Sequence, residues 1–402
     1  MSRILLAWEL GTGLGHLGPF LSLVPKLLER GHKIHIAARE ISSACRAVDA
    51  LPVMVHQAPL CLNTYGGLQE PPLNYAEILM RYGYLEPAML RAMLAAWSSL
   101  ICSTEADIVI ADHAPTALLA ARILDIPRAV IGGPFNVPPP ADPMPNMRTW
   151  VAVPHQRLAD SDHRVLKVIN EAVPRGADID ALRRIFDGAA HFFSGVPELD
   201  PYGARDPGDY LGLQVMSTGS GDPTWPAGDG KKVFAYLNSG YKHLERALQA
   251  LADSGVRVLA YVFGGNESLL GRYRSARLNF TPQPLDFHLV AADCDLCVCH
   301  GNSGTTLGML HGGRPVLVLP MHLEHFLLGK RVESTGAGCV VHPETAEPDI
   351  SGTLATMLGT ETFGQNARAL ASRYAGGSVG TMTDRAIARI EALSAKAAGS
   401  QT

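Results

Sequence analysis

The chain has 402 residues, more than the ~100–200 that are usual for one domain, so two domains are the first expectation. Hydrophobic residues make up 47% and charged residues 18%, which suits a folded globular protein and excludes a disordered one. The net charge is -4, and the chain contains no run of five or six Lys or Arg. Nucleic acid is therefore not an expected partner, because binding it requires a basic surface.

The first residues, MSRILLAWELGTG, contain a short apolar run that is broken by Glu9 and followed by glycines. This pattern favours a buried first strand over a signal peptide. No apolar stretch reaches the ~18–20 residues that cross a bilayer. We therefore expect a cytoplasmic protein without a membrane span, in which the seven cysteines are free thiols. The sequence does not specify an oligomeric state.

The first half of the chain alternates between strand and helix patterns. Residues 3–8 predict a strand, which is followed by a glycine-rich turn, a periodic apolar helix that ends at Gly31, and a second strand over 33–40. The same order recurs as strand, helix and strand over 106–113, 115–126 and 127–133. This alternation is typical of a doubly wound parallel sheet.

The second half repeats the alternation. It predicts strands over 232–240, 257–265, 294–300 and 314–320, with helices over 241–255 and 305–313. Residues 205–231 are rich in Gly, Pro, Asp and Ser, which is linker composition. We therefore expect a first domain over 1–210, a linker over 211–231 and a second domain over 232–402, whose last helix can pack back on the first domain.

The first candidate site is the glycine-rich turn after the first strand. Gly13, Gly15 and Gly18 match the dinucleotide-binding pattern G-x-G-x-x-G, and Glu40 stands where that pattern places a ribose-binding acid. This match keeps an NAD(P)-dependent oxidoreductase as an alternative. His16, however, stands in the middle of the turn, where an imidazole would interfere with a pyrophosphate. An imidazole held there favours a general base that takes a proton from a hydroxyl.

A carboxylate on the other ring nitrogen makes such a base more effective. Asp112, at the end of the strand in ADIVIADH, is the candidate. Asp112 is equally a candidate to cap the helix that starts at Pro115, and the two roles are compatible.

The second candidate site follows a strand of the second half. The run His300-Gly301-Asn302-Ser303-Gly304-Thr305-Thr306 brings small residues and hydroxyl donors to the start of a helix. Free backbone N–H groups at a helix N-terminus bind a diphosphate. Ser239 and Gly240, after an earlier strand, are expected to add donors. A Walker lysine is absent from this run, which excludes a P-loop NTPase.

Cys294, Cys297, Cys299 and His300 have a spacing that partly resembles a metal site. Cys297 and Cys299 alternate within an apolar strand, so both side chains point to one buried face. We therefore predict buried thiols and no metal ion.

The segment that begins at His300 resembles a known protein family. The segment HGNSGTTLGMLHGGRPVLVLP, with the following MHLEHF and Gly336-Ala-Gly338, resembles the donor-binding signature of family-one glycosyltransferases of the GT-B fold, including bacterial antibiotic and macrolide glycosyltransferases. The turn around His16 and the strand ending at Asp112 resemble the same family's catalytic loop and acid-bearing strand. The resemblance covers most of the chain, except for 56–105 and 135–190. It implies two Rossmann-like doubly wound domains facing a central cleft.

Carried over to this sequence, the resemblance implies that His16 deprotonates the acceptor with Asp112 as its partner. It implies a donor site made of Ser239, Gly240, Phe280, Gln283, His300, Gly301, Asn302, Ser303, Gly304, Thr305, Glu324 and His325. Within it, Phe280 and Gln283 occupy the stretch that receives the nucleobase. Glu324 stands where an acid binds sugar hydroxyls.

Three positions depart from the family pattern. His325 replaces the usual Gln, Phe280 replaces the usual stacking Trp, and Gly308 replaces a glutamate that grips the ribose of uridine-diphosphate donors. The resemblance therefore leaves UDP- and dTDP-sugars both open as donors.

The expected reaction is a metal-independent, inverting transfer of a sugar from a nucleotide diphosphate to a hydroxyl of a small-molecule acceptor, with no cofactor. The leaving charge would be stabilised by a helix N-terminus and hydroxyl donors. The acceptor site is expected in residues 56–90, with Tyr65, Tyr75, Tyr82 and Tyr84, and in the proline-rich loop over 132–150. Such tyrosines suit a hydrophobic or aromatic acceptor, or are half-buried core residues. A nucleotide-sugar epimerase of the same architecture remains a second alternative.

Overall fold

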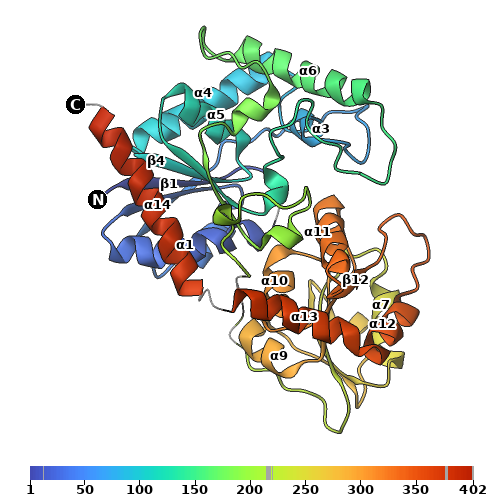
Figure 1. Ribbon diagram of the computed structural model, residues 1–402. Coiled ribbons are helices and arrows are strands. Elements are labelled where there is room, and N and C mark those ends of the chain that lie inside the picture. The colour runs from blue at the N-terminus through green and yellow to red at the C-terminus, as the bar shows by residue number, and fades with distance from the viewer. Residues whose placement is uncertain (12, 214–218, 220, 376–378, 401–402) are drawn as a thin grey trace. The chain divides into compact units, whose positions relative to one another are not determined.

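The computed structural model describes all residues except 12, 214–218, 220, 376–378 and 401–402. The chain forms two compact units (Figure 1), which are Met1–Phe193 together with Thr383–Thr402, and Ser194–Met382. We call them the first and second units. Each unit contains one six-stranded sheet in which every pair of neighbouring strands is parallel.

The sheet of the first unit has the order β3-β2-β1-β4-β5-β6. Its strands are β1 (Arg3–Trp8), β2 (Lys33–Ala38), β3 (Val53–Gln57), β4 (Ile108–Asp112), β5 (Arg128–Gly132) and β6 (Ala190–Phe193). Its helices are α1 (Gly18–Glu29), α2 (Ile41–Ala47), α3 (Tyr75–Met80), α4 (Pro87–Ser103), α5 (Pro115–Ile123), α6 (His155–Ala172) and α14 (Val379–Ser400), with short 3-10 turns η1 (Leu14–His16), η2 (Pro134–Asn136) and η3 (Leu182–Ile185).

β1 and β4 lie at the centre of this sheet, and their residues from Ile4 to Trp8 and from Ile108 to Asp112 are buried. A near-continuous apolar run is the pattern of a parallel strand that is covered on both faces. Trp8 and Asp112 are register partners at the carboxyl ends of the two strands. The loops that follow β1 and β4 therefore begin side by side, at the edge where such sheets bind ligands.

The last helix, α14, packs with the first unit from Thr383 onward. In Figure 1 it lies beside α1. Lys26 of α1 pairs with Asp384 and Arg30, the C-cap residue of α1, pairs with Glu391, at 2.9 Å each, and Ser394 Oγ lies 3.1 Å from Ser2 Oγ. Ion pairs and a hydrogen bond thus hold the last helix against the first helix and the start of the first strand.

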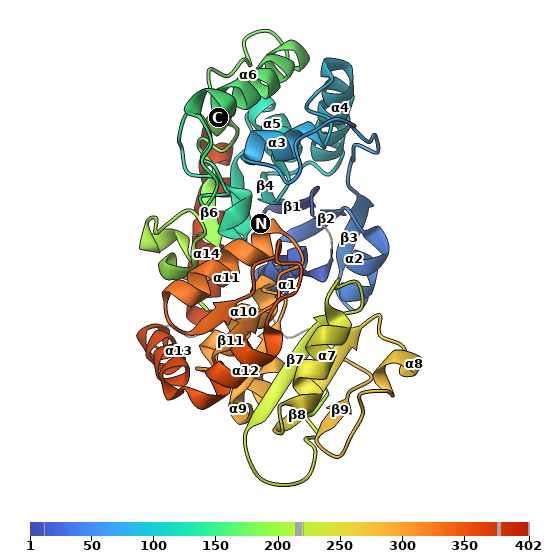
Figure 2. The same cartoon turned by 90° about the vertical axis from the view of Figure 1, so that its right-hand side faces the viewer.

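The sheet of the second unit has the order β12-β11-β10-β7-β8-β9. Its strands are β7 (Lys232–Asn238), β8 (Arg257–Phe263), β9 (Leu278–Phe280), β10 (Leu296–Cys299), β11 (Val316–Val318) and β12 (Gly338–Val340), and Figure 2 shows β7, β8 and β9 side by side. Its helices are α7 (Leu244–Asp253), α8 (Glu267–Leu270), α9 (Phe287–Asp293), α10 (Ser303–His311), α11 (Leu323–Ser334), α12 (Ile350–Gly359) and α13 (Glu361–Tyr374), with 3-10 turns η4 (Pro197–Leu199) and η5 (Pro207–Asp209).

Two hydrophobic clusters cover the two faces of this sheet. Val233, Ala235 and Leu237 of β7 belong to one cluster, whereas Phe234 belongs to the other. Cys297 and Cys299 lie with Phe234 in the second cluster and are buried, as their alternation predicts.

The expectation of two doubly wound α/β domains is confirmed. The boundaries of the two units differ from the expected domain boundaries, because residues 194–210 pack with the second unit. The Glu198 carbonyl accepts a hydrogen bond from Arg331 Nε at 3.0 Å, and its carboxylate pairs with Arg373 at 2.9 Å. Of the expected linker over 211–231, residues 214–218 and 220 lie outside the described residues.

The segments 56–105 and 135–190, which the resemblance did not cover, contain helices α3, α4 and α6. Within the part of the chain that the structure describes, no helix combines the length and the apolar character needed to span a membrane.

Candidate active site

His16 ends the short turn η1, between β1 and α1. Its Nδ1 lies 3.2 Å from Asp112 Oδ1, and its ring stacks on Trp8 at a centroid distance of 5.4 Å. The side chain is 13% exposed. The carboxylate orients the imidazole because it accepts the Nδ1 proton, which leaves Nε2 as the proton-accepting nitrogen. The His–Asp pairing expected from the sequence is therefore present in the geometry.

Asp112 is buried at the end of β4. Burial raises the pKa of its carboxyl, and the neighbouring His16 and a hydrogen bond from Asn136 partly oppose this shift. Asn136 Nδ2 donates to Asp112 Oδ1 at 3.1 Å. Gly132, at the end of β5, has φ +102°, and a Cβ there would stand 2.7 Å from both carboxylate oxygens. Only glycine therefore fits beside this carboxylate.

The turn before His16 is also shaped by glycine. Gly11 has φ +78°, and a Cβ there would stand 2.1 Å from His16 Nε2. Gly13 has φ +87° and open space around it. The Gly13 N–H donates to Glu40 Oε1 at 3.0 Å. Glu40, the carboxylate that an oxidoreductase would use to bind a ribose, is therefore hydrogen-bonded to the glycine turn.

Glu9 lies directly after β1 and is fully buried. Thr116 donates to it from its backbone N–H at 2.9 Å and from its hydroxyl at 2.5 Å. Tyr84 Oη lies 2.9 Å from the same Thr116 hydroxyl. Burial raises the pKa of Glu9 to about 7, although the hydrogen bonds from Thr116 act in the opposite direction.

Tyr75 and Tyr84 are buried, and Tyr65 and Tyr82 are half-buried. Two of the four tyrosines proposed for the acceptor thus belong to the core of the first unit. Tyr75 still borders the site, because its ring centroid lies 6.0 Å from that of His113, the residue after Asp112.

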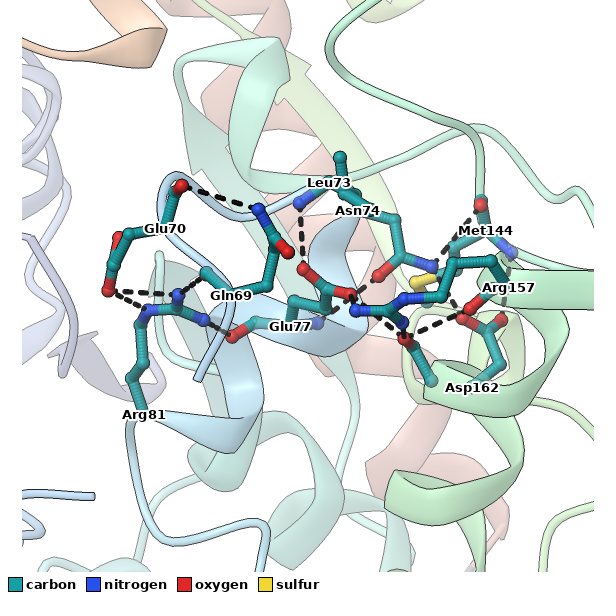
Figure 3. A network of polar contacts seen from close by, with 10 residues as sticks. Gln69, Glu70, Leu73, Asn74, Glu77, Arg81, Met144, Arg157 and Asp162 are labelled. Carbon is teal, nitrogen blue, oxygen red and sulfur yellow. Dashed lines mark hydrogen bonds and ion pairs between the residues drawn. The ribbon is translucent and has the colours of Figure 1, made fainter. Parts of the chain in front are cut away.

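The two segments proposed to form the acceptor site are joined by a polar network around α3 (Figure 3). Glu77 is buried and accepts from the Leu73 N–H at 2.9 Å, from Ser161 Oγ at 3.0 Å and from Arg157 at 2.6 Å. Asn74 Nδ2 donates at 2.8 Å to Asp162.

Asp162 also accepts from the Met144 N–H at 2.8 Å in the proline-rich loop. Burial raises the pKa of Asp162 to about 6. The network therefore links the loop before α3, the proline-rich loop and α6.

In the second unit, the run from His300 to Thr305 links β10 to α10. Asn302 is the N-cap of α10, but its side chain makes no capping hydrogen bond, and its Nδ2 donates instead to Thr305 Oγ1 at 3.1 Å. Ser303 and Gly304 are half-buried, whereas Thr305 is buried. The first N–H groups of α10 therefore have no side-chain cap from the N-cap residue, which is the condition under which a helix N-terminus receives an anion.

Both ring nitrogens of His300 have hydrogen-bond partners. Its Nε2 accepts from the Asn238 N–H at 2.8 Å, and its Nδ1 lies 2.7 Å from the Leu319 carbonyl. The proton therefore sits on Nδ1, and burial lowers the pKa of the imidazole. In this arrangement His300 joins the carboxyl ends of β7 and β11, a role that the sequence did not reveal.

Gly301, beside His300, has φ +88°, and a Cβ there would stand 2.7 Å from the His325 carbonyl oxygen and from Val318. Ser239 and Gly240 are exposed after β7. Ser239 lines a pocket of about 440 Å³ with Tyr241, His243 and neighbouring residues.

Phe280 and Gln283 differ in their exposure to solvent. Gln283 is exposed, but Phe280 is buried in the core, with the Arg274 guanidinium 5.6 Å from the centre of its ring. A nucleobase stacking on Phe280 would have to displace Arg274.

Glu324, in the first turn of α11, is half-buried and interacts electrostatically with Tyr202. His325 is half-buried, and its ring centroid lies 3.6 Å from that of His322. Burial holds the pKa of His325 well below its usual range. Gly308 is buried within α10.

Among the residues that the structure describes, no group of three His, Cys, Asp or Glu is arranged to hold a metal ion. Asp-x-Asp sequences occur at 160–162, 178–180 and 293–295. In each of these sequences the second carboxylate is bound within the protein, Asp162 to Asn74, Asp180 to Arg184 at 2.7 Å and Asp295 to the Lys232 N–H at 2.7 Å.

Sequence reasoning did not single out Gly132, Asn136 and His113, which surround Asp112, although the first two lie in the loop assigned to the acceptor. Gly132 and Asn136 stand in the segment GGPFN directly after a predicted strand. That position, at the carboxyl end of a strand next to β4, is the signal that could have indicated them.

Comparison with known proteins supports this architecture. Residues 281–381 match the family model described as "Erythromycin biosynthesis protein CIII-like, C-terminal domain". A PGL/p-HBAD biosynthesis glycosyltransferase of Mycobacterium tuberculosis (strain ATCC 25177 / H37Ra) is 28% identical over 309 residues, which are 71% of this chain and 71% of that protein.

Two solved structures share the fold. The calicheamicin glycosyltransferase CalG4 aligns with a TM-score of 0.70 at 19% identity and covers 98% of both chains. The glycosyltransferase VinC in complex with DTDP aligns with a TM-score of 0.66 at 16% identity and covers 98% of this chain and 100% of its own.

The fold is that of GT-B glycosyltransferases, and the chain is similar in sequence to proteins named as glycosyltransferases. Its resemblance to glycosyltransferases of antibiotic biosynthesis is confirmed. The oxidoreductase interpretation of the glycine turn is not supported.

Proposed function

We propose that the protein transfers a sugar from a nucleoside diphosphate to a hydroxyl of a small-molecule acceptor by a single displacement that inverts the anomeric configuration. The observation that carries this proposal is the His16–Asp112 pair, with Nδ1 3.2 Å from the buried carboxylate. A base oriented in this way needs no covalent enzyme intermediate, because it activates the attacking hydroxyl itself.

In the proposed step, the acceptor O–H bond breaks and its proton moves to His16 Nε2. The acceptor oxygen forms a bond to the anomeric carbon while the bond from that carbon to the diphosphate oxygen breaks. The diphosphate leaves with the electron pair. Asp112 stabilises the imidazolium that forms, as a carboxylate does beside any protonated histidine base.

The leaving charge is proposed to be stabilised at the N-terminus of α10. The N-cap side chain of Asn302 is turned to Thr305, and Ser303 adds a hydroxyl donor. A helix N-terminus and fixed donors stabilise developing negative charge without a metal ion. We therefore propose that the reaction needs neither a metal ion nor a cofactor. We also propose that the protein acts in the cytoplasm.

The donor is proposed to be a UDP- or dTDP-sugar, with thymidine diphosphate tested first. Gly308 provides no carboxylate for a ribose, and VinC was crystallised with dTDP. Glu324 is the candidate for sugar hydroxyls, together with Ser239, Gly240 and Gln283 around the nucleotide. The acceptor is proposed to be small and hydrophobic or aromatic, because Tyr75 borders His113 beside the dyad.

The test is thermal-shift binding of dTDP, UDP, GDP, NAD and NADP in the presence of a chelator, with Ser303→Asp as the decisive variant. A carboxylate at a helix N-terminus does not weaken the helix, but it repels a diphosphate. Ser303→Asp should therefore keep the melting temperature of the unliganded protein and lose the stabilisation by dTDP or UDP. Ser351→Asp, at the N-terminus of α12, is the matched control and should keep both.

Transfer is then measured with the donor that binds, using His16→Ala. The proposal requires a loss of about 10²–10⁴-fold in turnover, the range for a general base. Stabilisation by NAD or NADP alone, or full transfer by His16→Ala, would contradict it. Hydrolysis or isomerisation of the donor without acceptor, at the rate of transfer, would favour an epimerase.

A further inference from the structure

His113 follows Asp112 directly, yet the proposed chemistry does not use it. It has φ +47°, in the left-handed region that a residue with a Cβ seldom adopts. Its carbonyl accepts a hydrogen bond from the Leu10 N–H at 2.9 Å, so the loop after β1 holds this backbone conformation. Strained backbone of this kind concentrates at functional sites.

His113 as a whole residue is 9% exposed, and among the described residues neither of its ring nitrogens has a hydrogen-bond partner. Burial holds the pKa of His113 well below its usual range, so the ring is neutral and offers one donor and one acceptor. Buried polar atoms in native proteins are almost always hydrogen-bonded, and exceptions require an explanation.

Asn136 supplies a third such atom. It is 3% exposed, and its Nδ2 donates to Asp112 Oδ1 at 3.1 Å. Because the carboxylate accepts, the amide must present its NH₂ group to Asp112, and Oδ1 faces away. Within the described part of the chain, Asn136 Oδ1 has no partner.

These unpartnered atoms gather around the dyad. The ring centroids of His113 and His16 lie 6.1 Å apart, and those of His113 and Tyr75 lie 6.0 Å apart. Asn136 contacts the same carboxylate as His16. A donor from His113 and an acceptor from Asn136 match the two requirements of one hydroxyl group, which accepts one hydrogen bond and donates another.

We propose that His113 and Asn136 bind a second hydroxyl of the acceptor, next to the hydroxyl that reacts at His16, so that the enzyme selects acceptors with two neighbouring hydroxyls on an aromatic ring. This inference rests on the proposed function. A site with buried hydrogen-bonding groups rejects an analogue that lacks the partner, because those groups then remain unpaired.

The test uses a matched pair of aromatic probes, 2,3-dihydroxynaphthalene and 2-naphthol, which differ in one hydroxyl. Their dissociation constants are measured by calorimetry without a donor, so the result does not depend on catalysis. The wild type is expected to bind the diol at least about 10-fold more tightly than the mono-ol, the effect of one good hydrogen bond to a buried partner.

The decisive variant is His113→Phe, which keeps a ring but removes both nitrogens. It should lose the preference for the diol, keep its affinity for 2-naphthol and remain folded, as its melting curve shows. His113→Asn, which suits the left-handed backbone, serves as a second variant and should lose the same preference. His163→Phe, on the exposed side of α6, should change neither affinity.

A wild type that binds both probes equally, or neither, would overturn the proposal. A His113→Phe variant that retains the preference for the diol would overturn it as well. An equal loss of affinity for both probes would also overturn it, because it would indicate that His113 acts only in packing. The transfer experiment with His16→Ala tests the proposed function separately: a diol preference with full transfer by His16→Ala would refute the general base and leave the diol site standing.

Discussion

Gly11 lies against the ring of His16, so that a Cβ on Gly11 would stand 2.1 Å from Nε2. Asp112 holds the opposite nitrogen, Nδ1. The absence of a side chain at residue 11 therefore leaves room for the ring position in which His16 faces Asp112. We therefore predict that Gly11, and not only the His16–Asp112 pair, affects activity.

We predict that Gly11→Ala lowers turnover by at least about 10²-fold, because the new methyl group displaces the proton-accepting nitrogen, and general-base catalysis contributes in this range. Gly13→Ala is the matched control. Gly13 has a similar φ of +87° but open space around it, so this variant bears the same kind of backbone strain without the contact. Steady-state kinetics and melting temperatures of the two variants check the prediction, and equal turnover in both would refute it.

Asp112→Asn should lower turnover by about 10²–10⁴-fold while leaving the binding of dTDP or UDP unchanged, since an amide neither fixes the Nδ1–H tautomer nor stabilises the imidazolium. The control is Asp125→Asn, an exposed position with φ +53° that asparagine tolerates. Kinetics and nucleotide titration are measured on both proteins. Normal turnover in Asp112→Asn would remove Asp112 from the mechanism.

Glu9 should make stability fall as the pH rises. Its pKa is about 7 in the folded protein against 4.5 for the ordinary group. Below pH 4.5 both states hold the proton, and between 4.5 and 7 only the folded state does, so unfolding becomes progressively easier. Above pH 7 the folded state has lost about 3 kcal/mol relative to low pH.

Glu9→Gln removes this titration and retains hydrogen-bonding groups for Thr116. Its stability relative to the wild type should therefore increase between pH 5 and pH 8. Denaturant unfolding at several pH values provides the measurement. Parallel pH profiles of the two proteins would show that Glu9 does not titrate in this range.

Glu77→Ala should destabilise the first unit by about 2–4 kcal/mol, because it removes the buried carboxylate that accepts from the Leu73 N–H and the Ser161 hydroxyl and that pairs with Arg157. Glu70→Ala, which removes an exposed partner of Arg81, should cost less than about 1 kcal/mol. Chemical denaturation compares the two, and equal losses would contradict the assigned role of Glu77.

Much of the fold was predictable because the pattern is local. The strands around Ile4, Ile108 and Val233 are apolar runs, and such a run depends on neighbouring residues alone. The positions of the loops around His16 and around 300–306 were predictable as well, since a parallel sheet places ligand-binding loops at the carboxyl ends of its strands. Their roles in catalysis and binding stay predictions.

The tertiary structure decided what those loops contact. His16 and Asp112 are 96 positions apart, and the order β1-β4 brings them together. The same sheet order places Asn136 beside Asp112. No local pattern records that the ring of His300 is occupied by Asn238 and Leu319, or that Phe280 is buried under Arg274.

The sequence by itself thus determined the strands, the helices and the loops that carry reactive groups, because hydrophobic periodicity and glycine act within a few residues. The tertiary structure alone decided which polar atoms are satisfied and which remain unpaired, such as those of His113 and Asn136 among the described residues. Hydrogen bonding and burial depend on residues that are distant in the chain, and only the packed sheet brings them within reach of one another.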